Sequence, residues 1–299
     1  MSGMIDDAAG IEPALGFVPS EAKIARREML SQLARSATFL VGSVVVAFWV
    51  FWGIVGARLT PQDPLAQSSS VLAPPSSAHW FGTDQLGRDV LSRVLAGASD
   101  TLSVAPLATL LGIVAGTILG LITGFWGGGL ADDTISRVID AVLALPLIVI
   151  AVLALVALGS SKSTLVIVIG FVFTPIVART VRATVLGERD LDYVQAARLR
   201  GERAPFIMGK EILPNVMGPI VVEATVRLGY AIFAIAGLTF LGFGVQPPSP
   251  DWSLQISDNY TLLSASNYWW TVLFPGLAIA TLIIGVNLVA DGLQQVVDR

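Results

Sequence analysis

The polar residues that could do chemistry are few in this chain, and the densest group lies in one short run. Asp84, Arg88, Asp89 and Arg93 alternate carboxylate and guanidinium groups shortly after His79. Groups of these types can act as general acids and bases when they flank a substrate. However, His79 is the only histidine and the chain has no cysteine, so neither a nucleophile–base set nor a metal site is indicated. We therefore predict that these residues hold a compact loop together by hydrogen bonds and ion pairs, with no catalytic or metal-binding residues.

A second candidate, the sequence GSSKST at residues 159–164, has some features of a phosphate-binding loop. In such a loop a glycine directly precedes the lysine, and another glycine stands at a fixed distance upstream. Here Ser161 precedes Lys162, and the upstream Gly159 is misplaced. The sequence has no other phosphate-binding signature, so we expect no cofactor on this chain and no ATP hydrolysis by it.

A third candidate is a pair of charges inside an apolar stretch. Glu223 and Arg227 are four residues apart, which puts them on one helix face in the favourable order of acid before base. A charge inside a membrane normally faces a partner or a water-filled cavity. Two interpretations stay open. The favoured one is an internal ion pair that neutralises both groups, and the other is a pair of pore residues that contact substrate.

The elements that must position these residues are membrane-spanning helices. The chain of 299 residues is 54% hydrophobic and only 13% charged, and its mean hydropathy is +0.74. That composition is typical of a membrane protein. A span must be helical because lipid offers no partner to an open backbone, so we predict an all-α polytopic fold with six transmembrane helices. They are Phe39–Ala57, Leu102–Trp126, Val138–Leu158, Thr164–Val181, Val221–Gly242 and Thr271–Ala290.

The placement of Lys and Arg predicts the orientation of these spans. With the N-terminus inside, only Arg58, Arg88, Arg93 and Lys162 lie outside and Arg227 lies within a span. The remaining 13 of the 18 basic residues then face the cytoplasm. Cytoplasmic loops carry the excess of Lys and Arg in membrane proteins. Both termini, and the polar loop between the fourth and fifth spans, are therefore predicted to be cytoplasmic.

The second predicted span carries glycines at strict four-residue spacing. Gly112, Gly116, Gly120 and Gly124 fall on one helix face, which is the pattern of close helix packing in membranes. The chain has 29 glycines, so chance is the alternative. Four in register favour a packing surface, either for this subunit's own helices or for a partner's.

The loop between the fourth and fifth spans has a defined pattern of its own. Residues 192–199 read as a short helix, and Gly201 supplies the helix stop. A second short helical piece starts at Pro205, and Pro214 is expected to end it and start a new direction. Two short helices cannot bury themselves. They are therefore either a knob that docks into a groove on another protein or a solvated basic loop.

This loop resembles the EAA motif of bacterial ABC-importer permeases. The likeness rests on the order of the small pair Ala196-Ala197, then Gly201, then Leu213-Pro214, at the motif's spacing. In that family the loop is cytoplasmic and forms coupling helices that fit into the ATPase subunits. The resemblance thus implies coupling by these residues. The chain has Gln195 where the motif usually has Glu, so docking by shape is implied more strongly than docking by a salt bridge.

Two other stretches look like the dipeptide/oligopeptide/nickel branch of this permease family. They are HWFGTDQLGRDVLSR at residues 79–93 and the run from LGFG at 241–244 to VQPPSPDW at 245–252. The likeness implies the ABC type I importer permease fold, a bacterial inner-membrane location and transport of di- or oligopeptides. Import of nickel, glutathione or another small solute is the alternative within the branch.

The same resemblance implies partners. They are a homologous second permease subunit, two ATPase subunits or one fused ATPase, and an extracytoplasmic substrate-binding protein. ATP and Mg would be bound by the ATPase subunits, and membrane lipid surrounds the chain. No nucleic-acid partner is expected.

The expected organisation has three parts. Residues 1–36 form a cytoplasmic tail without a cleavable signal peptide, in which residues 20–35 are either an amphipathic helix at the membrane surface or a loose segment. Residues 37–96 hold the first span and an extracytoplasmic loop. Residues 97–299 form a five-helix permease core that contains the coupling loop, residues 183–217.

Two other classes of membrane protein compete with the importer. A secondary transporter should show an ion-coupling constellation in its spans, and here only the Glu223–Arg227 pair, Asp140 and Asn287 are available. A membrane-embedded enzyme would need a nucleophile with a base, or a metal set, and neither is apparent. We therefore predict a permease that is not itself an enzyme.

Overall fold

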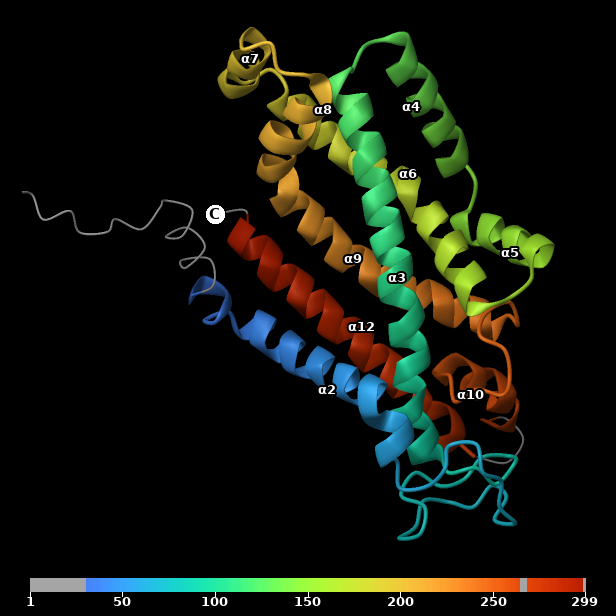
Figure 1. Cartoon of the computed structure of the whole chain (residues 1–299). Coiled ribbons are helices and arrows are strands. Elements are labelled where there is room, and N and C mark those ends of the chain that lie inside the picture. The colour runs from blue at the N-terminus through green and yellow to red at the C-terminus, as the bar shows by residue number, and fades with distance from the viewer. Residues whose placement is uncertain (1–30, 264–267, 298–299) are drawn as a thin grey trace, which may run out of the picture.

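The computed structural model describes residues 31–263 and 268–297, and these residues form a bundle of helices (Figure 1). The predicted tail up to residue 30 lies outside the described residues. Within the described ranges the only extended pairing is one isolated bridge between Thr83 and Asp89, in agreement with the predicted all-α fold. The helices are α2 (Ala37–Leu59), α3 (Val90–Phe125), α4 (Leu130–Leu143), α5 (Leu147–Leu158), α6 (Lys162–Glu188), α7 (Asp192–Leu199), α8 (Ala204–Phe206), η1 (Ile207–Ile212), α9 (Leu213–Phe240), α10 (Trp252–Asn259) and α12 (Trp270–Val297).

Five helices of the described residues are long and apolar enough to cross a membrane: α2, α3, α6, the continuous helix 204–240 and α12. The predicted third span is instead two helices, α4 and α5, which meet at an angle of 87°. Pro146 precedes α5 as its N-cap. Proline lacks the N–H that would continue α4, and its ring clashes with the carbonyl four residues before it. The expected single span is thus a broken one.

The bent pair α4–α5 carries the chain from one end of the bundle to the other. Asp132 in the first turn of α4 binds Arg182 near the end of α6. Lys162, which follows α5, pairs with Asp100 in the early turns of α3. The first turn of α2 lies beside the last turns of α12 (Figure 1), because Phe39 packs against Gly292. This arrangement fits the six crossings with both termini on one side, which stay predictions.

Helix α3 begins twelve residues before the predicted start of the second span. Asp89 accepts a hydrogen bond from the backbone N–H of Ser92 and so caps the helix at Val90. At 36 residues, α3 is about 54 Å long, which exceeds the roughly 30 Å hydrocarbon core of a bilayer. The expected boundary between residues 96 and 97 therefore falls inside a continuous helix rather than at a linker.

The run of acids and bases after His79 forms a compact loop under α3, as predicted. The Asp84 carboxylate accepts from the Arg88 side chain (Nε to Oδ2, 2.6 Å) and from its backbone N–H. The Asp89 carboxylate contacts His79 Nδ1 at 2.9 Å and caps α3. Arg93 is fully buried and donates to the carbonyl of Ser249 in the segment before α10. These charges are used for structure.

The centre of the bundle is the contact between α3 and α6. A Cβ on Gly112, Gly116, Gly120 or Gly124 would lie only 2.5–2.9 Å from a Cβ on α6. Such distances leave no room for a side chain, so the two backbones touch along four successive turns. The α6 partners repeat every four residues as well: Phe173, Val177, Val181 and Val185.

This contact generates a prediction for the bundle. In Gly116→Ala the new Cβ would lie 2.5 Å from the Cβ of Val177, so the helices must separate. Overpacking typically costs about 1–3 kcal/mol, and we expect a lower melting temperature of the purified permease in detergent. The control is Gly276→Ala on α12, where an added Cβ meets nothing within 4 Å. Equal melting temperatures for the two variants would show that α3 and α6 are not in close contact.

Candidate functional site

The loop between α6 and α9 begins as the sequence predicts. Helix α7 spans Asp192–Leu199, and Gly201 follows with a φ of +77°. The Gly201 N–H donates to the Arg198 carbonyl, and the Glu202 N–H donates to the Ala197 carbonyl. Together these two bonds form a Schellman ending, which needs a residue in the left-handed conformation. Glycine adopts that conformation without a steric cost.

The second half of the loop differs from the prediction. Pro205 lies in the first turn of α8, as expected, but Pro214 does not end the helix. The chain stays helical from residue 204 to residue 240, because residues 207–212 widen into a π-helix in which the Leu213 N–H bonds to the Met208 carbonyl. A widened turn of this kind accommodates a proline that cannot donate. The loop is therefore continuous with the membrane helix α9.

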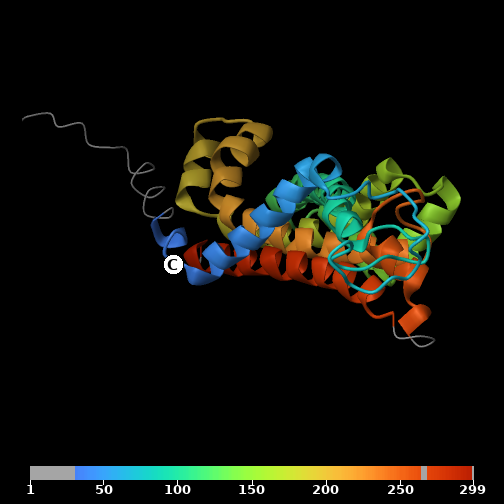
Figure 2. The ribbon, with the colours of Figure 1, turned by 90° about the horizontal axis from the view of Figure 1, so that it is seen from below.

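The two short helices do not bury themselves alone, because one side of them lies in a core that they share with the bundle. Val194 and Ala197 on α7 are fully buried against Ile207 and Ile212 of η1. The same cluster continues through Val216, Val181 and Val185 into the α3–α6 contact. The loop is thus a folded extension of the bundle, and Figure 2 shows it standing clear of the other helices.

The face that the loop leaves open differs from the predicted one at Ala197. Of the small pair, Ala196 is exposed but Ala197 is buried inside the chain. Gln195 and Gly201 are exposed beside Ala196. The most exposed large apolar side chain of the loop is Leu199, which is 90% exposed. Sequence reasoning did not single out Leu199, although a leucine within a polar and basic loop was a visible signal.

Polar contacts fasten the loop to the end of α3. Arg189 donates to the carbonyls of Gly124 and Gly127, at 3.3 Å and 3.0 Å. The Arg198 guanidinium lies over the Phe125 ring, 5.1 Å from its centre. Cation–π contacts of this kind are attractive within about 6 Å. These contacts hold the start of the loop against the end of α3.

Two further contacts stiffen the loop itself. The Tyr193 hydroxyl donates to Glu188 at 2.7 Å, and burial, with this bond, raises the pKa of Tyr193 to about 12. The hydroxyl therefore keeps its proton at neutral pH. Arg200, just after α7, binds Glu211 of η1 at 2.9 Å. The latter pair links the two ends of the short helical hairpin.

The other predicted site is the pair in α9. Arg227 Nε lies 2.6 Å from Glu223 Oε1, and both side chains are largely buried. The Arg227 guanidinium also lies over the ring of Tyr230, 5.2 Å from its centre. The structure thus forms the internal ion pair that the favoured interpretation requires. In the described part of the chain no cluster of three or more His, Asp or Glu side chains is arranged to hold a metal ion.

Comparison of the chain with known proteins shows a family match. Residues 116–299 match the family described as binding-protein-dependent transport system inner membrane component. That match contains the loop, α9 and most of the glycine contact.

Several curated relatives resemble the chain over nearly its whole length. A dipeptide transport system permease protein of Alkalihalophilus pseudofirmus is 37% identical, covering 91% of this chain and 89% of the relative. A di/tripeptide transport system permease protein of Pseudomonas aeruginosa is 35% identical over 98% and 96% of the two chains. A probable D,D-dipeptide transport system permease protein of Escherichia coli is 34% identical over 91% and 90%.

The family match covers more than half of the chain, and the relatives extend it to the outer loop and α2. The helices that can cross a membrane agree with it. This chain therefore belongs to the family of binding-protein-dependent transport system inner membrane components, as a multi-pass permease subunit of an ABC transporter that is not itself catalytic.

Proposed function

We propose that this chain is one of two homologous permease subunits in an importer that moves di- or oligopeptides across the bacterial inner membrane. An extracytoplasmic binding protein delivers the peptide, and two ATPase subunits, or one fused ATPase, bind ATP and Mg. The observation that carries the substrate class is the set of peptide permeases that align with more than nine-tenths of this chain. Full-length similarity includes the outer loops that would receive the substrate.

The loop at residues 191–213 is the part of the chain best suited to meet the ATPases. It projects from the bundle, it is stiff, and it presents Gln195, Ala196 and Leu199 to its surroundings. Leu199 is the natural anchor, because an apolar side chain in a partner's pocket gains most from leaving water. Gln195 offers one neutral hydrogen bond and no charge. Recognition then depends on shape more than on charge.

The connection from the loop to α9 supports a coupling mechanism. One end of the loop follows α6, which the glycine contact fixes to α3. The other end is helically continuous with α9. When ATP binding closes the ATPases, a displaced loop turns α9 against the fixed α3–α6 pair. Access can then alternate between two states, because each partner binds one of them more tightly.

The substrate class is tested with the assembled complex. We expect the permease pair, its ATPases and its binding protein, reconstituted in vesicles, to hydrolyse ATP faster when a dipeptide such as Ala-Ala is added. Nickel ions and glutathione should leave the rate unchanged. If nickel ions or glutathione stimulate ATP hydrolysis and peptides do not, the transporter imports a small solute of that kind and not peptides. Uptake driven by an ion gradient without ATPases would point to a secondary transporter.

The coupling role of the loop is tested at Gly201 and Gln195. Gly201→Val places a β-branched residue at φ +77°, where the left-handed conformation costs at least about 1–2 kcal/mol. We expect it to abolish transport and to detach or uncouple the ATPases while the chain still inserts. Gln195→Ala removes at most one neutral hydrogen bond, worth about 0.5–1.5 kcal/mol, and Gln195→Glu should be tolerated. If Gln195→Ala proves as damaging as Gly201→Val, polar recognition dominates over shape.

The anchor role of Leu199 is tested separately. Because its side chain is 90% exposed, Leu199→Ser should leave the melting temperature of the isolated permease unchanged. It should nevertheless reduce co-purification of the ATPases and peptide-stimulated ATP hydrolysis. The matched control is Leu158→Ser, since Leu158 is 68% exposed at the end of α5, outside the loop. Equal co-purification for the two variants would remove Leu199 from the docking surface.

A further inference from the structure

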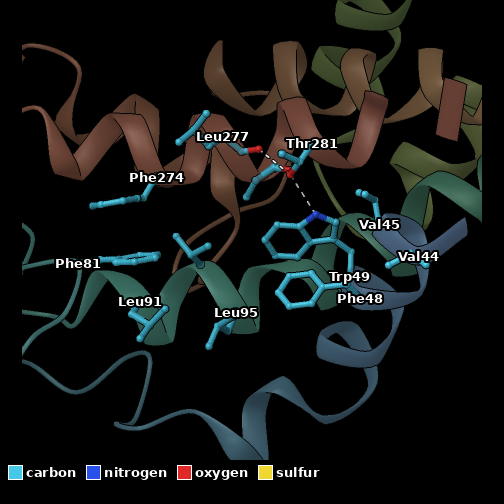
Figure 3. A pocket seen from close by; sticks show the side chains of 12 residues that line it. Val44, Val45, Phe48, Trp49, Phe81, Leu91, Leu95, Phe274, Leu277 and Thr281 are labelled. Carbon is cyan, nitrogen blue, oxygen red and sulfur yellow. Dashed lines mark hydrogen bonds between the residues drawn. The ribbon is translucent and has the colours of Figure 1, made fainter. Parts of the chain in front are cut away.

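An apolar groove of about 610 Å³ lies between α2, α12 and the first turns of α3 (Figure 3). Phe48 and Trp49 come from α2, Leu91 and Leu95 from α3, and Leu277 from α12. Each of the three helices is among those long and apolar enough to cross a membrane. The groove therefore lies among the helices that can cross a membrane, away from the loop described above.

Small residues create this groove by making α2 change partners along its length. In its first half α2 touches α12, where a Cβ on Gly42 would lie 2.7 Å from the Gly285 carbonyl oxygen. In its second half α2 touches α3 instead, at Gly53 and Gly56. Figure 2 shows α2 running obliquely across α12. From the Gly42–Gly285 contact α2 and α12 diverge, and the first turns of α3 line the bottom of the space between them.

The lining has no polar group left for a polar occupant. Trp49 Nε1 donates to the Thr281 hydroxyl at 3.1 Å (Figure 3), and that hydroxyl donates in turn to the Leu277 carbonyl at 2.7 Å. These two groups bind each other and their own helix. The remaining lining side chains are aliphatic or aromatic. Water or a peptide would lose hydrogen bonds here, whereas hydrocarbon would gain dispersion contacts with the rings.

Both ends of the groove are closed. At one end α2 and α12 are in backbone contact at Gly42 and Gly285. Towards the other end the rings of Phe81 and Phe274 are stacked, 3.8 Å apart and nearly parallel. A transmembrane helix is about 10–12 Å wide and runs the whole thickness of the bilayer, so it cannot sink into a wedge with closed ends. A thin chain that terminates within the membrane can.

We propose that this groove binds one acyl chain of a membrane phospholipid, from the leaflet on the side of the 60–89 loop. The mouth lies between Val44, Phe48 and Leu277, which are 70%, 49% and 48% exposed, so the chain enters from the surrounding lipid. Trp49 at the back of the groove packs edge-to-face on Trp252 of α10, with ring centres 4.8 Å apart. The bound chain thus supports a contact between α2 and the outer helix α10.

The test uses the assembled transporter in vesicles of phosphatidylethanolamine doped with an analogue whose acyl chain carries a terminal diazirine. After illumination, mass spectrometry should find the label concentrated on peptides that contain Trp49 and Leu91. Leu91→Trp fills the floor of the groove and should lower this labelling about tenfold, which corresponds to about 1.4 kcal/mol of binding free energy. The matched control is Leu107→Trp on the exposed side of α3, which should leave it unchanged.

A second pair keeps the test sharp if Leu91→Trp does not fold. Leu277→Trp narrows the mouth from α12. Its control is Ile284→Trp, because Ile284 is exposed and lies about two turns beyond Leu277 along α12, outside the groove lining. Equal labelling of groove and of exposed helix faces would overturn the proposal. So would a groove that is labelled in the isolated chain but protected in the complex, because a second subunit would then cover it. These outcomes do not depend on which solute is transported.

Discussion

The structure depends on one contact, in which α3 and α6 meet backbone to backbone along four glycines. Lipid is as apolar as leucine, so helices in a membrane gain little from hydrophobic burial against each other. They associate by close packing, and a side chain at any of the four positions would prevent it. The result is that α6 is the central helix. In its most apolar stretch of 18 residues 61% of the residues are buried, compared with 17% in the corresponding stretch of α2.

Polar bonds close both ends of this pair. At one end Lys162 pairs with Asp100, which also accepts from the Ser249 hydroxyl. At the other end Arg189 binds the carbonyls of Gly124 and Gly127. The pair is therefore fastened at both ends, and the loop joins it to the helix that continues into α9. In the mechanism that we propose, the loop passes its displacement to α9 while α3 and α6 stay together.

The sequence predicts the parts of this arrangement that follow from local rules. Gly201 and the helix before it obey capping rules, and the glycine spacing indicates a packing face. The early start of α3 and the passage through Pro214 were missed, because each depends on how the backbone redistributes hydrogen bonds around a cap or a proline. The orientation of α7 was missed for another reason. Ala196 and Ala197 are chemically identical, and only the packing of Val194 against Ile207 and Ile212 decides that Ala197 faces inwards.

The same use of small residues explains why α2 needs lipid. Its glycines bring it against α12 in its first half and against α3 in its second half. A helix that changes partners in this way leaves space where it parts from the first one, and an unfilled space forfeits dispersion energy on all its walls. In a soluble protein a further side chain would fill it. In a membrane the solvent itself can, so an acyl chain held between Phe48 and Leu277 would complete the packing of α2 and, through Trp49 and Trp252, steady the outer helix α10.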